Sequence, residues 1–142
     1  MAGFVHSRGP LTTAWFPKIA STAIAVGDLL YADLSGAVQP ADSTSGNHIG
    51  VCQKAIASTD SDYADTTSIP VQLVGPHTFF RAEAAGTATT AMVLGYYDLT
   101  DANTVNLAAQ SKNVVLVTKF ISTTEVEVCV SASAFVVNVA TT

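Results

Sequence analysis

Charged residues are scarce in this chain. Only 12% of its 142 residues are Asp, Glu, Lys or Arg, which is about half the usual share of a soluble domain. The 6 basic and 11 acidic residues give a formal net charge of −5. Because phosphate binding needs clustered Lys and Arg, this balance argues against a nucleic-acid partner. The least polar stretch, residues 128–139, is too short to span a bilayer, so we expect no membrane partner either.

Cysteine is also rare, and the start of the chain has no apolar run behind a basic start. Cys52 and Cys129 are too few for a disulfide framework. A cysteine in an alternating strand is usually a small core residue, and a Cys52–Cys129 bridge or a reactive thiol are the alternatives. Without the pattern of a signal peptide, we expect synthesis in a cytosol.

Recognised catalytic and cofactor motifs are missing as well. The chain has no G-x-S-x-G, P-loop or dinucleotide fingerprint. The acidic run 60–65 lacks the glycine and the distal glutamate of a calcium loop. No histidine has zinc-binding spacing with a cysteine; the three are His6, His48 and His77. We therefore expect no enzyme activity, no cofactor and no metal site.

The chain does contain one stretch twice. Residues 30–59 match residues 95–124 at a constant offset of 65, with an intervening loop in each copy. The runs between turn residues are short and alternate in polarity, which is typical of strands. The matched pairs include Tyr31 and Tyr96, Asp33 and Asp98, Ile49 and Val114, Lys54 and Lys119, and Ile56 and Ile121.

This repeat predicts an all-β fold, a compact barrel-like domain over 23–142 with two similar units at about 23–76 and 88–141. The repeated Asp33 and Asp98 each precede a turn. We expect them to accept backbone N–H groups in that turn, whereas an acid–base pair would require the two carboxylates to be close in space.

Residues 1–22 differ from the rest, because they contain His6, Arg8 and Lys18 but no acid. They also carry several large apolar side chains, and prolines at 10 and 17 keep the preceding backbone extended. Two interpretations are open: an edge strand wrapped onto its own domain, or an extended N-terminal arm that docks on an acidic neighbour. Since the repeated units begin after Ala23, the second interpretation predicts that deleting residues 2–16 leaves a folded domain.

The first copy carries a resemblance. Val26-Gly27-Asp28-Leu29-Leu30-Tyr31, Ser35-Gly36-Ala37-Val38 and His48-Ile49-Gly50-Val51 resemble the head decoration (cement) proteins of tailed bacteriophages. The pattern covers roughly residues 24–56. It recurs in weaker form over 91–124, where Met92-Val93 replaces Gly27-Asp28 and Val115 replaces Gly50. The resemblance implies a β-tulip fold, usually trimeric, whose N-terminal arm binds the coat lattice.

The resulting expectation is a structural virion protein, made in the host cytoplasm, that stabilises a phage capsid by bridging coat subunits on its outer surface. Its expected partners are the major capsid protein and further copies of itself, as a homotrimer. Low charge with much Ser, Thr and Ala suits surfaces that become buried between subunits. The candidate capsid contacts are Phe4, Val5, Arg8, Leu11, Trp15, Phe16 and Lys18.

Two other classes of function stay open. One is a host-recognition or glycan-binding β module, like a fibre knob or adhesin, which would expose aromatic rings to sugars. The candidate aromatic residues are Trp15, Tyr63, Tyr96 and Tyr97. The other is an enzyme built at a trimer interface from Asp33 or Asp98.

Overall fold

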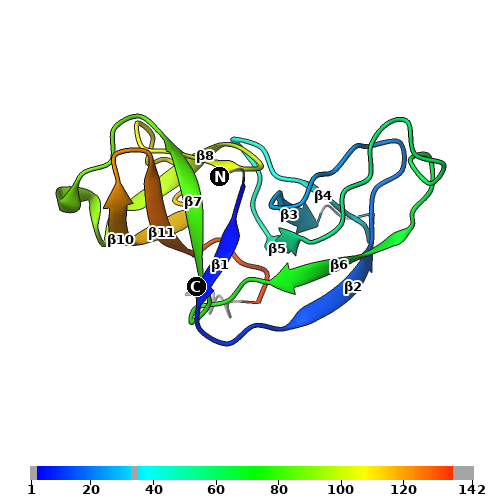
Figure 1. The fold of residues 1–142 in the computed structure, drawn as a ribbon, viewed down its shortest axis with the longest axis horizontal. Coiled ribbons are helices and arrows are strands. Elements are labelled where there is room, and N and C mark those ends of the chain that lie inside the picture. Colours follow the sequence, from blue (N-terminus) through cyan, green and yellow to red (C-terminus); the bar gives the residue numbers. More distant parts are fainter. Residues whose placement is uncertain (1–2, 33–34, 136–142) are drawn as a thin grey trace, which may run out of the picture.

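The structure, a computed structural model, describes residues 3–32 and 35–135. Within these ranges the regular structure is all-β, except for one turn of 3-10 helix, η1 (Thr90–Met92). The expected fold class is confirmed. Figure 1 shows two groups of strands side by side along the long axis, joined by segments that pass between them.

One group is a closed barrel formed mainly by the second half of the chain. Its strands are hydrogen-bonded in the order β7, β11, β10, β8 and β9, and a parallel pairing of β9 with β7 closes the ring. β1 pairs antiparallel with the first half of β7, on the side where β9 pairs with the second half. The strands are β1 (Val5–Arg8), β7 (Phe79–Ala85), β8 (Tyr96–Asp101), β9 (Thr104–Asn106), β10 (Val115–Ser122) and β11 (Glu125–Val130).

The other group is a five-stranded sheet formed by the first half of the chain. Its strands lie in the order β2, β6, β5, β3 and β4, and all neighbours are antiparallel. Just after β2, Lys18 forms a parallel bridge with Val38 of β4. The strands are β2 (Thr13–Pro17), β3 (Leu29–Ala32), β4 (Val38–Pro40), β5 (His48–Cys52) and β6 (Ser68–Leu73).

The two groups share one topology. In each, the first strand pairs with the fifth, the fifth with the fourth, the fourth with the second, and the second with the third. The first and third strands then meet in parallel, at Lys18 and Val38 in the sheet and at Glu83 and Thr104 in the barrel. The segments that match in sequence therefore take equivalent places: β3 and β5 correspond to β8 and β10.

The expected boundaries of the units need correction. β2 lies before residue 23 and β7 before residue 88, yet these are the first strands of the two groups. The fifth strands, β6 and β11, do not keep the sequence offset of 65 residues. Their separation along the chain is shorter, because residues 53–67 join β5 to β6 whereas only residues 123–124 join β10 to β11. Residues 134 and 135 lie in a turn, and residues 136–142 fall outside the described part of the chain.

Two apolar cores stabilise the molecule. The smaller lies within the five-stranded sheet and includes Leu30, Ile69 and Val71. The larger fills the barrel and continues onto the sheet, where Leu29 and Val51 pack against it. β5 is consequently buried along its whole length, with Val51 in the larger core and Ile49 and Cys52 in the smaller. This sandwiching joins the two groups into one compact domain.

Candidate functional site

The N-terminal segment is not an arm separate from the domain. β1 is a strand of the barrel group, and β2 pairs with β6 along Thr13–Pro17. The first interpretation, strands wrapped onto their own domain, is what the structure contains for residues 3–22. The boundary at residue 22 was wrong, because residues 13–17 pair with β6 and Phe16 packs against the smaller core.

Phe4 is a core residue and cannot contact a capsid. Its side chain is almost completely buried in the larger core, and its N–H donates to the carbonyl of Gly27 at 2.8 Å. Phe16 is half-buried against the smaller core. The aromatic character of these two positions therefore serves folding.

Lys18 was also wrongly predicted to contact a capsid, because its side chain has no exposed surface. Its ammonium donates to the carbonyls of Ile19 at 3.0 Å and Tyr63 at 2.8 Å, with Thr22 at 3.4 Å. The Nζ atom also lies 5.6 Å from the centroid of the Tyr63 ring. Buried ammonium groups need such partners, so Lys18 joins β2 to the loop after β5 rather than meeting another protein.

Arg8 is 60% exposed along its side chain but is engaged with its own barrel. Its Nε and Nη2 donate to Oε1 of Glu127 at 3.1 and 3.0 Å, and its guanidinium lies 4.1 Å from the Phe79 ring centroid. Alternation along β11 places Glu127 on the outer face, yet its side chain is only 4% exposed, and Ser7 of β1 and Thr118 of β10 also donate to its carboxylate. Burial raises the pKa of Glu127, but bonds from Arg8, Thr118 and Ser7 outweigh that effect and hold the pKa below its usual range.

Three of the seven candidate contacts present apolar surface to solvent. Val5 is 45% exposed, Leu11 is 41% exposed and Trp15 is 63% exposed. Trp15 lies in β2, and Leu11 precedes the strand by two residues. With Arg8, they are the members of the expected set that a partner can reach.

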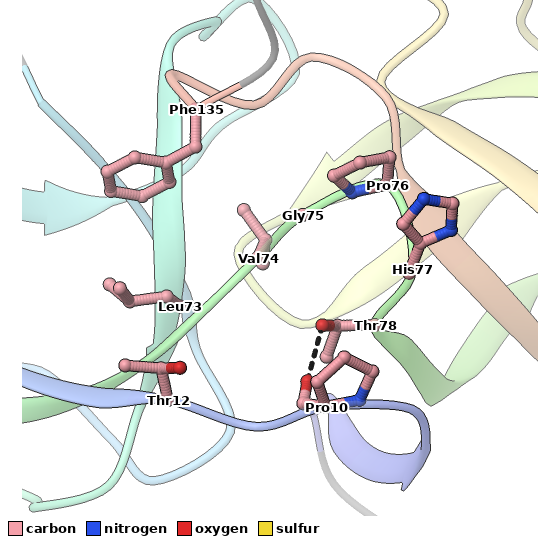
Figure 2. A pocket seen from close by; sticks show the side chains of 9 residues that line it. All are labelled: Pro10, Thr12, Leu73, Val74, Gly75, Pro76, His77, Thr78 and Phe135. Carbon is pink, nitrogen blue, oxygen red and sulfur yellow. Dashed lines mark hydrogen bonds between the residues drawn. The ribbon is translucent and has the colours of Figure 1, made fainter.

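An apolar cavity, which sequence reasoning missed, lies where two linkers cross between the groups. Its volume is about 380 Å³, and Figure 2 shows the residues that line it. Thr78 closes one side by donating its hydroxyl to the carbonyl of Pro10 at 2.6 Å. The Gly75-Pro76 turn in the sequence indicates the linker between β6 and β7. It does not indicate that residues 10–12, which lead into β2, lie beside that linker. The lining residues are Pro10, Thr12, Leu73, Val74, Gly75, Pro76, His77, Thr78 and Phe135.

Asp98 has a structural role. Its buried carboxylate accepts N–H bonds from Ser111, Lys112 and Asn113 at 3.0, 2.7 and 2.8 Å, and a hydroxyl bond from Ser111 at 2.8 Å. Burial raises the pKa of Asp98, but these bonds together hold it below its usual value. The expectation of backbone N–H partners was right in kind but wrong in place, since they belong to residues 111–113. Asp33, its counterpart, lies outside the described residues.

His48 and Ser45 form a buried pair. The His48 Nδ1 lies 3.0 Å from the carbonyl of Ala132, which can only accept, so Nδ1 carries the proton. Nε2 lies 3.0 Å from the hydroxyl of Ser45, whose oxygen also bonds the backbone of Asp42. The backbone of His48 also exchanges bonds with Ala132 and Ala134. The pair therefore holds the segment after β11 against the five-stranded sheet, and burial lowers the pKa of His48.

We expect the free energy of unfolding to fall as the pH drops below about 6.5, the ordinary pKa of histidine. Because the folded-state pKa of His48 is lowered, the unfolded chain binds more protons there. The contribution is complete above the unfolded pKa and is lost progressively between that value and the folded pKa. Denaturant titrations at pH 7.5 and 5.5 measure it. His48→Gln should lose most of the difference, whereas His6→Gln, at a partly exposed position, should keep it; equal pH responses of the two variants would contradict this assignment.

The remaining candidates carry no chemistry that the geometry brings together. Cys52 and Cys129 are buried and free, as expected for core residues, and burial raises the pKa of both thiols. Within residues 3–32 and 35–135, no three His, Cys, Asp or Glu side chains gather as a metal site would require. The part of the chain that the structure describes also has no helix of the length and apolarity needed to cross a membrane.

The four aromatic residues considered for glycan binding do not form one surface. Tyr97 is buried in the larger core, and Tyr63 is half-buried beside Lys18. Trp15 and Tyr96 are exposed but belong to different strand groups.

Comparison with known proteins identifies no relative of this chain. No protein-family model matches the sequence, and no curated protein matches it significantly.

Proposed function

We propose that this protein is a structural virion protein that binds the outer surface of a tailed-phage capsid and stabilises the shell by bridging coat subunits. The observation that supports this most is the exposed apolar surface of the N-terminal segment, at Val5, Leu11 and Trp15. The resemblance of residues 24–56 to head decoration proteins supports it independently.

Apolar contacts would supply most of the binding free energy. Burying one large apolar side chain contributes about 1.5–3 kcal/mol, and Trp15 has the largest exposed ring of the segment. Arg8 already pairs with Glu127, so it has little to add beyond about 1 kcal/mol of surface electrostatics. Many copies on one shell then act multivalently.

Trp15→Ala is expected to weaken binding to the shell by about 10- to 100-fold, the equivalent of losing one buried ring. The measurement is co-sedimentation with expanded coat-protein shells of the encoding phage that lack this protein. Tyr96→Ala is the matched control, because Tyr96 is also an exposed aromatic residue but lies on the barrel. It should bind like the wild type.

Equal binding by both variants, or no binding by the wild type, would contradict the proposal. If the wild type ignores shells but is retained on immobilised glycans, and Trp15→Ala abolishes retention, the host-recognition function is the correct one. Lys18→Ala is not informative about binding, since Lys18 is buried and its removal affects folding.

A further inference from the structure

One edge of the five-stranded sheet is open. β2 pairs with β6 along Thr13–Pro17, and on its other side only Lys18, beyond the strand, meets Val38. In the part of the chain that the structure describes, no strand pairs with the other edge of residues 13–16. Figure 1 shows β2 running along the outside of the molecule with β6 on its inner side.

The barrel shows that this fold can hold a further strand at the same place. β2 and β7 are equivalent, because each is the first strand of its group and pairs antiparallel with the fifth. Trp15 of β2 lies opposite Pro70 of β6, and Arg81 of β7 lies opposite Glu127 of β11. One edge of β7 has two partners in succession. β1 pairs with Phe79–Arg81, and β9 pairs in parallel with β7 from Glu83 onward. Among residues 3–32 and 35–135, the sheet has the equivalent of β9 in β4 but no equivalent of β1.

The backbone of β2 is oriented to accept such a strand. The carbonyl of Thr12 accepts from Leu73 at 2.8 Å, and the N–H of Lys18 donates to Thr67 at 3.0 Å, so the even-numbered residues face β6. By alternation, the N–H and C=O groups of Thr13 and Trp15 point to the open side. Exposed edges are normally protected by charged side chains, yet residues 11–16 carry none.

We propose that a second copy of this chain occupies the open edge, with β2 antiparallel to β2 around a two-fold axis. Two identical edges without charge meet no like-charge repulsion, and a two-fold contact is self-complementary. Thr13 of each copy exchanges hydrogen bonds with Trp15 of the other, which places Ala14 at the axis. Pro17 has no N–H to donate, so it ends the ladder.

The pairing joins the two sheets into one continuous sheet. Because the two-fold axis is perpendicular to a continuous antiparallel sheet, both Trp15 rings lie on the same outer face. Each ring lies opposite Thr13 of the second copy and diagonal to its Leu11, which are the positions where side chains interact across strands. A pair of copies therefore presents two Trp15 side chains in one direction.

The test is made on the free protein, so its outcome is separate from that of capsid binding. At about 100 µM the wild type should sediment at twice 14.6 kDa. Thr13→Lys and Trp15→Lys each place two like charges at diagonal positions across the paired strands, about 7–8 Å apart, and should shift the mass to the monomer. Tyr96→Lys adds the same charge to the barrel and should leave the pair intact. A monomeric or trimeric wild type, or Thr13→Lys that still pairs, would overturn the proposal.

Ala14→Cys tests the register and does not depend on the lysine variants folding. Residues at a non-hydrogen-bonded antiparallel position have Cα atoms about 4.5 Å apart, within the range that a disulfide spans. Mild oxidation should convert this variant to a covalent pair at least tenfold faster than Leu94→Cys, an exposed position on the barrel. The native cysteines are buried and should contribute no background. Equal rates at the two positions would exclude the two-fold pairing.

Discussion

A chain that lacks residues 2–16 is expected not to fold. The deletion removes β1 and nearly all of β2, so β6 loses its partner along Thr13–Phe16. It also removes Phe4 from the larger core, where the side chain is 2% exposed. A domain of this size has a free energy of unfolding of only about 5–15 kcal/mol, and the loss of the buried Phe4 side chain alone removes about 3–5 kcal/mol of it. Circular dichroism and thermal melting should show no cooperative transition.

Phe4→Ala is the graded form of this prediction. Truncating a buried phenylalanine to alanine costs about 3–5 kcal/mol of the free energy of unfolding. Trp15→Ala is the control on the same segment, and because Trp15 is mostly exposed, its effect should be below about 1 kcal/mol. A truncated protein with a sharp, reversible melting transition would show instead that the segment is an independent arm.

Asp98→Ala is expected to destabilise the protein by about 3 kcal/mol or more. The substitution removes four bonds to a charged acceptor, each worth about 1.5–3 kcal/mol before relaxation, and leaves the N–H groups of Ser111, Lys112 and Asn113 to find water. Asp101→Ala is the matched control. Asp101 is exposed and accepts one backbone bond, from Asn103 at 3.0 Å, so its loss should cost about 1 kcal/mol or less. Urea titration at pH 7 measures both.

The pH dependence distinguishes the two aspartates further. The folded-state pKa of Asp98 is lowered, so its contribution to stability is present above the unfolded pKa of about 3.9 and is lost as the pH falls through the folded pKa. The wild type should therefore lose stability at acid pH more steeply than Asp98→Ala. Parallel acid titrations of the wild type and this variant would contradict the assigned role of the 111–113 bonds.

The sequence by itself determined the fold class and the repeat. Alternation of apolar and polar residues and frequent turn residues argue against long helices, and the constant offset between two matching stretches predicts two units of like topology. It also favoured the core for Cys52 and Cys129, but it did not separate the exposed Trp15 from the buried Phe4. These conclusions depend on local pattern, since backbone geometry makes the period of two visible in any strand.

Only the tertiary structure decided what covers each face. Alternation places Glu127 on the outer side of β11, but the Ser7 and Arg8 side chains of β1 reach across β7 and donate to its carboxylate. Lys18 carries a charge that predicts exposure, yet three carbonyls from sequence-distant and nearby segments solvate its ammonium. The partners of Asp98 and His48 likewise come from residues 111–113 and 132. A buried polar group is stable only with such partners, and which partners arrive depends on the packing of whole strands rather than on the residue's own neighbours.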